Sequence, residues 1–321
     1  LREDLAAAVV YRPRGVAPVA NDAAAFQSML SSGAVLPLDP ITPREPQAVL
    51  PPARANFVRE EASVRVYELP SGIPVLVRQR SNAPITHIGI YAATGAAHEP
   101  RERAGISALA ARTSVRGTPT RTSLQIAEES ELLGGSIGAS VSSESFGWSF
   151  SVPPAHLKPA IALLADVVQH ATLDDDALET ERSAMIADAA RLRDDMYRYP
   201  LRLANEAAYP EHPYSIPAGG TETSLRELAA QDVRDWYRTM LLRAPFVIAL
   251  TGDMDADDVA SAIATSFSEL APRSRDTLPA PYWPDKVTER VVARDKTQSA
   301  LVLGFPSASR TDADRFAAHV L

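Results

Sequence analysis

The chain contains no cysteine among its 321 residues. Disulfide bonds and thiolate metal sites are therefore excluded, although the absence of cysteine does not decide the compartment. The chain also lacks an excess of basic residues, because its formal net charge is −8 at pH 7. A nucleic acid or an anionic membrane surface would require a basic face, so we expect neither as the main partner.

Long apolar runs and a leader are also missing. No run reaches the length of a membrane span, and no charged and then apolar segment with a small-residue cleavage site stands at the start. The chain begins at Leu1 rather than Met and stops at Leu321, inside a segment that resembles an amphipathic helix. We therefore expect both ends to continue into a longer protein.

The composition that remains is that of a globular protein. Hydrophobic residues make up 45% and charged residues 22% of the chain, enough for one large domain or two of ordinary size. Residues 1–60 differ from the rest, because a short strand-like segment near Val9 is followed by Pro-rich, weakly patterned sequence. We interpret 1–60 as the end of a preceding domain plus a semi-rigid linker, with an ordinary extended N-terminal arm as the alternative.

Clear periodicity begins at Val64. Alternating apolar residues and turn signals predict strands at 64–69, 75–77, 86–93, 136–142, 145–152 and 246–251. Caps and helical spacing predict helices at 103–115, 122–133, 154–169, 174–194, 222–241 and 255–270. This mixture predicts an α+β domain over 61–275, with an antiparallel or mixed sheet flanked by helices. Expected strands at 287–293 and 299–304 would begin a second αβ domain over 276–321.

The most informative stretch is 105–118, which reads Gly-Ile-Ser-Ala-Leu-Ala-Ala-Arg-Thr-Ser-Val-Arg-Gly-Thr. Its frame matches the inverted zinc motif H-x-x-E-H, in which two His one helical turn apart bind the metal and Glu polarises water. Helical spacing places Ala108, Ala111 and Arg112 on one face, where the ligands and the base would converge. None of the three can bind zinc or act as a base.

The surroundings of this stretch resemble the pitrilysin/insulinase family of zinc metallopeptidases. The similar segments occur in family order over about 64–321 and begin at Ser71-Gly-Ile-Pro, His87-Ile-Gly-Ile, Ala104-Gly-Ile, Arg116-Gly-Thr, Glu131-Leu-Leu-Gly-Gly, Glu181-Arg-Ser-Ala, His212-Pro-Tyr-Ser, Thr251-Gly-Asp-Met and Gln298-Ser-Ala-Leu. The resemblance implies a pitrilysin-like fold for 61–275, without catalytic or metal-binding residues. It also implies that 276–321 starts a second, homologous domain that is truncated here.

In active members of the family, a third zinc ligand lies on a later helix, seven residues after another carboxylate. The resemblance places Asp188 at the ligand position and Glu181 at the other carboxylate position. A lone carboxylate does not hold zinc without His or thiolate partners. Our hypothesis is that Arg112 replaces the cation and pairs with Asp188 or Glu181. The alternative is that Arg112 points to solvent.

The resemblance also suggests a peptide-binding edge. In active relatives the strand after the Gly-Gly stop is a sheet edge on which substrate adds as an extra strand, mainly through main-chain hydrogen bonds. The corresponding residues are Ser136, Ile137, Gly138, Ala139, Ser140, Val141 and Ser142. Their small side chains would allow close approach of a peptide backbone. The alternative is that small polar residues only discourage aggregation at the edge.

Other motifs give weaker signals. The acids at 253–258 alternate as in a calcium loop, but Asp258 and Ala264 stand where that loop needs Gly and Glu, so we predict a helix cap. His98 and Glu99 would open an H-E-x-x-H motif that is not completed.

The resemblance implies the non-catalytic half of a two-half zinc metalloendopeptidase. Such a half needs no cofactor of its own. Zinc would belong to a catalytic pitrilysin-like half, in the same chain or a separate subunit, and the two would enclose a peptide or unfolded protein substrate. The alternative is a structural or assembly protein of the same fold, without proteolysis. We expect a periplasmic location, with the cytoplasm as the alternative.

Overall fold

The computed structural model describes residues 22, 24–25, 28, 53–274, 277–295, 297–309 and 312–320. The chain divides into two units, Leu1–Val49 and Leu50–Leu321, and the fold described below belongs to the second. The strand predicted near Val9 and most of the predicted linker lie outside the described residues.

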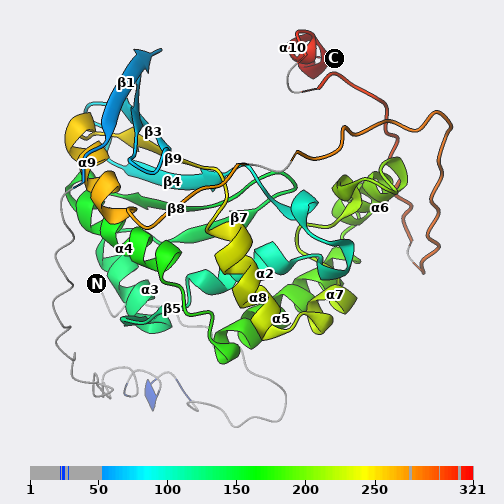
Figure 1. Cartoon of the computed structure of the whole chain (residues 1–321). Coiled ribbons are helices and arrows are strands. Elements are labelled where there is room, and N and C mark those ends of the chain that lie inside the picture. The colour runs from blue at the N-terminus through cyan, green and yellow to red at the C-terminus, as the bar shows by residue number, and fades with distance from the viewer. Residues whose placement is uncertain are drawn as a thin grey trace. The chain divides into compact units, whose positions relative to one another are not determined.

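The second unit is built on one seven-stranded sheet with the order β1-β2-β3-β9-β4-β8-β7 (Figure 1). Its strands are β1 Asn56–Glu61, β2 Val64–Glu68, β3 Pro74–Gln79, β4 Thr86–Ala92, β7 Gly138–Val141, β8 Phe146–Val152 and β9 Phe246–Gly252. The pair β3 and β9 is parallel, and the other neighbours are antiparallel. The prediction of a mixed sheet is therefore confirmed. A separate short hairpin joins β5 Gly117–Thr118 to β6 Arg121–Thr122.

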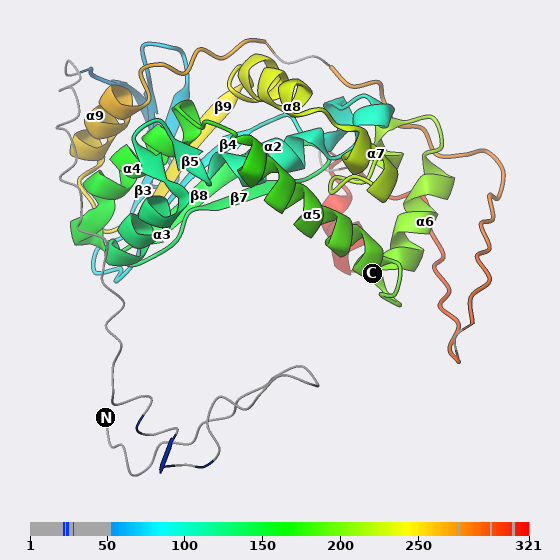
Figure 2. The ribbon, with the colours of Figure 1, turned by 90° about the horizontal axis from the view of Figure 1, so that it is seen from below.

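Helices cover one face of this sheet (Figures 1 and 2). The described helices are α2 Ile106–Ser114, α3 Ser123–Leu132, α4 Leu157–Gln169, α5 Asp175–Leu192, α6 Arg198–Ala208, α7 Glu222–Glu227, α8 Ala230–Trp236, α9 Ala256–Ser266 and α10 Arg315–Val320. Among them, no helix combines the length and apolar character needed to cross a lipid bilayer.

Alternation along the central strands decides which face is buried. On β8, Phe146, Trp148 and Phe150 are buried, whereas Ser151 is exposed. Side chains of a strand point alternately to its two faces, so this pattern gives one apolar and one open face. The apolar face packs against α2 and α4, whose buried residues belong to the same hydrophobic core. The core thus holds α2 against the sheet.

Most predicted elements are present, with two differences in the helical part. The helix predicted over 222–241 is divided into α7, α8 and a π-helical turn, Tyr237–Leu241, because Leu228 and Ala229 adopt extended backbone angles. Helix α6 was not predicted. Pro200 discourages a helix assignment, but it lies in the first turn of α6, where proline removes no intrahelical hydrogen bond.

Both ends of the predicted domain differ as well. Strand β1 extends the sheet into 56–61, most of which we interpreted as linker. The strands predicted at 287–293 and 299–304 are wrong, because neither segment belongs to a sheet in the described residues. A strand requires a neighbour that satisfies its backbone hydrogen bonds, and alternation in the sequence cannot supply one.

The start of α3 is stabilised by a capping box. Thr122 Oγ1 accepts a hydrogen bond from Gln125 N at 3.3 Å, and Gln125 Oε1 accepts one from Thr122 N at 2.9 Å. We expect Thr122→Ala to lower the free energy of unfolding by about 1 kcal/mol. Ser123→Ala, an exposed change at the next position, is the control and should have a smaller effect in urea denaturation.

Candidate functional site: an arginine cluster at the expected metal position

Helix α2 carries the positions 108, 111 and 112, which match the zinc motif H-x-x-E-H in the sequence. Its N-terminal amides are capped from outside the helix, since Glu99 accepts hydrogen bonds from Gly105 N at 2.7 Å and Ser107 N at 3.0 Å. Gly105 has a φ of 91°, in the left-handed region that favours glycine. The cap and the core together fix the orientation of α2.

The three positions on α2 have different surroundings. Ala111 is buried, Ala108 is partly buried against the core, and the side chain of Arg112 is 38% exposed. Methyl groups at the first two positions offer no lone pair to a metal and no group that could polarise water.

Arg112 reaches both carboxylates on α5. Its Nε lies 2.8 Å from an oxygen of Glu181, and its Nη1 lies 3.3 Å from an oxygen of Asp188. The guanidinium therefore joins the two carboxylates that the resemblance places around the family's metal. A guanidinium carries a fixed positive charge and two-pronged donors, so it can neutralise carboxylates that would otherwise repel each other.

Arg116, one turn further along, completes the cluster. Its Nε donates to the other oxygen of Glu181 at 2.7 Å, and its Nη2 also contacts that oxygen. Glu181 is only 2% exposed, so a buried carboxylate has one arginine on each oxygen. We did not assign Arg116 to the site, although its i+4 spacing from Arg112 was a visible signal.

The resulting site does not fit zinc. The ligand positions on α2 hold Ala108 and Arg112, and both carboxylates on α5 already bond arginine. In the part of the chain that the structure describes, no group of three or more His, Cys, Asp or Glu side chains could hold a metal ion. The base position of the motif holds Ala111, whose methyl group cannot accept a proton, so the cluster has no general base there.

The predicted edge segment lies at the end of the sheet. Within the described residues, strand β7 is last in the strand order and pairs only with β8. It is shorter than predicted, because the strand covers Gly138–Val141 and leaves out Ser136, Ile137 and Ser142. Ser142 instead begins the turn to β8, where its N donates to Ser145 O at 2.7 Å.

Sequence comparison places these observations among known proteins. The family described as Insulinase (Peptidase family M16) matches residues 74–222, and the Peptidase M16 inactive domain matches residues 227–321. The chain belongs to the insulinase family, M16. The vacated positions on α2 therefore lie within the part that matches the peptidase domain of this family.

Curated relatives of this M16 chain are distant in sequence. The chain is 25% identical over 243 residues to an uncharacterized zinc protease of Bacillus subtilis, YmxG, covering 75% of this chain and 59% of that protein. It is 22% identical over 275 residues to a probable mitochondrial-processing peptidase subunit beta of Arabidopsis thaliana, covering 84% and 51%. The chain thus spans about half to three fifths of the length of these relatives.

Solved structures share the fold. A peptidase M16 inactive domain from Pseudomonas fluorescens superposes with a TM-score of 0.62 at 20% identity, covering 68% of this chain and 54% of that one. Pitrilysin superposes with a TM-score of 0.61 at 20% identity, covering 71% of this chain and 26% of its own. The predicted pitrilysin-like fold is therefore confirmed.

The cap of α2 makes the stability of this M16 chain depend on pH. Burial raises the pKa of Glu99 to about 7, against the opposing effect of hydrogen bonds from Ser107 and Gly105. An unfolded glutamate ionises near 4.5, so between about pH 4.5 and 7 the folded chain retains a proton that the unfolded chain has lost. Stability should fall as pH rises through this window, by on the order of 3 kcal/mol, and level off above it.

Urea denaturation across that pH range tests this expectation. Glu99→Gln retains an oxygen acceptor but does not titrate, so the slope contributed by Glu99 should disappear. Glu102→Gln removes an exposed carboxylate in the same loop and should leave the slope unchanged. An equal slope in the wild-type chain and in Glu99→Gln would contradict the assignment.

Proposed function

We propose that this chain is the non-catalytic half of a two-half zinc metallopeptidase, forming chamber wall and substrate contacts while a partner half hydrolyses peptides. The observation that carries the proposal is the cluster of Arg112, Arg116, Glu181 and Asp188, in which fixed cations bond the two carboxylates that the resemblance places around the family's metal. Hydrolysis would then depend on zinc in a catalytic pitrilysin-like half, where a metal-bound water acts as nucleophile. This chain alone would be inert.

The edge strand β7 supports a role in substrate contact. In the part of the chain that the structure describes, it pairs with a strand on one side only, and Gly138 and Ser140 are exposed. A peptide or unfolded protein segment can add to such an edge through main-chain hydrogen bonds. We further propose a periplasmic location for the assembly.

Reconstitution tests the division of labour. Zinc content and hydrolysis of a quenched fluorescent peptide would be measured for this chain, for a pitrilysin-like half with an intact H-x-x-E-H motif from the same source, and for the two together. Zinc and hydrolysis that depend on the H-x-x-E-H half, with a large increase in hydrolysis on mixing, are expected. Hydrolysis by this chain alone would refute the proposal. No effect of mixing would favour a structural protein of the same fold.

Photocrosslinking tests the peptide edge. A photoreactive residue at Ser140 should crosslink a labelled, unfolded peptide, because that position lies on the edge strand. The same residue at Ser183, exposed on α5, is the control and should give little product. Equal crosslinking at both positions would contradict a specific edge.

A further inference from the structure

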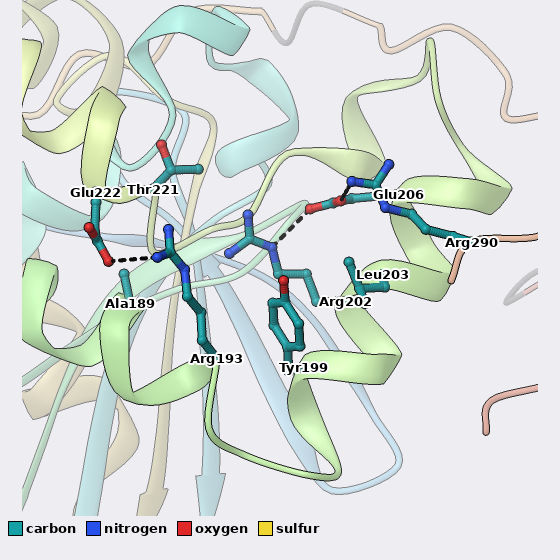
Figure 3. A pocket seen from close by; sticks show the side chains of 9 residues that line it. All are labelled: Ala189, Arg193, Tyr199, Arg202, Leu203, Glu206, Thr221, Glu222 and Arg290. Atoms are coloured by element: carbon teal, nitrogen blue, oxygen red, sulfur yellow. Dashed lines mark hydrogen bonds and ion pairs between the residues drawn. The ribbon is translucent and has the colours of Figure 1, made fainter. Parts of the chain in front are cut away.

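An arginine-rich cavity lies away from the cluster on α2. It has a volume of about 150 Å³ and is lined by residues from the end of α5, from α6 and from the start of α7 (Figure 3). Its charged side chains are Arg193, Arg202, Glu206, Glu222 and Arg290. A second hollow of about 300 Å³ shares Arg202, Glu206 and Arg290 with it, so the two lie side by side.

Positive charge exceeds negative charge in this cavity. Arg193 pairs with Glu222 at 3.4 Å, and Arg202 pairs with Glu206 at 2.9 Å. Arg290 adds a third guanidinium, but it approaches the same Glu206, at 3.7 Å. Three arginines therefore share two carboxylates, in a chain whose net charge is −8.

Arg202 retains donors for a ligand. Only its Nε is used by Glu206, and its two Nη atoms bond no other group of the described residues. Its side chain is 24% exposed, so its charge is partly removed from water. In Figure 3 the guanidinium groups of Arg193 and Arg202 lie between the two glutamates, toward the middle of the lining. An oxyanion there would accept hydrogen bonds from both cations and reduce their repulsion.

The size and position of the cavity limit the class of ligand that it can bind. A volume of 150 Å³ equals about five water molecules in the liquid, which suits an acidic side chain or a chain terminus but not a folded partner. A contact beside the larger hollow leads to the turn after strand β7. Ser215 lines it and accepts a hydrogen bond from Arg101 at 2.9 Å, while the adjacent Tyr214 bonds Glu144, in the turn after β7, at 2.6 Å.

We propose that this cavity binds carboxylate groups of acidic peptides, so that a peptide on the edge strand continues into it. The inference rests on the proposed function, because it names the substrate class that the chamber wall would select. Arg202 and Arg193 would hold the carboxylate, and Arg290 would contribute charge from the rim. Arg101 stabilises the wall of the larger hollow, because its Nη2 donates to Pro210 O at 3.0 Å and to Ser215 Oγ.

Direct binding to this chain tests the inference without hydrolysis. The probe is a short fluorescein-labelled peptide rich in Glu, measured by fluorescence anisotropy at low salt. The reference peptide has every Glu replaced by Gln and an amidated C-terminus. We expect the acidic peptide to bind at least about tenfold more tightly than the reference, which corresponds to 1.4 kcal/mol.

Charge-matched variants locate the effect. Arg202→Gln and Arg193→Gln should each weaken binding of the acidic peptide severalfold and leave the reference peptide unaffected. Arg59→Gln removes the same charge from an exposed position on β1 and should bind like the wild-type chain. Circular dichroism confirms folding, and Arg290→Gln, at a side chain 54% exposed, is a variant with little risk to the fold.

The outcomes separate this inference from the proposed function. Equal binding of both peptides, or Arg202→Gln and Arg193→Gln binding like Arg59→Gln, overturns it. Inorganic phosphate provides the second source of oxyanion, and phosphate binding without acidic-peptide binding also overturns it. If the acidic peptide binds but reconstitution yields no hydrolysis, the cavity is still a carboxylate site. Only the proposed peptidase role is then rejected.

Discussion

Restoring the motif on α2, by combining Ala108→His, Ala111→Glu and Arg112→His, is expected to give a chain that binds about one zinc ion per molecule. The two introduced imidazoles would stand one helical turn apart and face α5. Removing the Arg112 guanidinium frees the Asp188 oxygen that it bonds at 3.3 Å, while Arg191 stays on the other oxygen at 3.0 Å. The result would have two nitrogen ligands and one oxygen ligand, with a position left for water.

Metal analysis after dialysis, together with the visible absorption of the cobalt-substituted chain, measures this gain. Arg112→His alone is the matched control, because it removes the same guanidinium but supplies only one imidazole, and it should retain little zinc. Adding Asp188→Asn to the triple variant should weaken zinc binding. A triple variant that folds but takes up no more zinc than the single variant would show that these positions do not correspond to the family's ligands.

The second large effect is expected in the core. Trp148 is fully buried on β8, and its Nε1 donates to Ser114 Oγ on α2 at 2.8 Å. Its ring makes edge-to-face contacts with Phe146, at 5.4 Å between centroids, and with Tyr237, at 6.3 Å. Trp148→Ala should lower the free energy of unfolding by about 3–5 kcal/mol, through lost burial and the cavity left behind.

Urea denaturation compares this variant with two others. Trp148→Phe retains much of the apolar ring but leaves the Ser114 hydroxyl without its donor, so its loss should be smaller than that of alanine. Leu132→Ala changes a side chain that is 80% exposed on α3 and should shift stability by less than about 0.5 kcal/mol. A similar effect of Trp148→Ala and Leu132→Ala would show that Trp148 does not join the sheet to α2.

Local signals in the sequence were sufficient for much of the fold. The capped helix start near 122 and the alternation along β8 act within a few residues, so they were visible without the structure. The strands predicted at 287–293 and 299–304 depended on partners that no local pattern supplies, and they were wrong. Helix α6 was not predicted, and the proline in its first turn is compatible with a helix.

The sequence by itself determined that the metal chemistry is missing, because Ala108, Ala111 and Arg112 have no side-chain atoms able to serve as ligand or base. Only the tertiary structure decided what replaces that chemistry. It brought Arg112 and Arg116 to opposite oxygens of Glu181, and it gathered the arginines of the cavity from three segments of the chain. The identity of a side chain is local information, whereas its charge partner is set by the packing of helices distant in sequence.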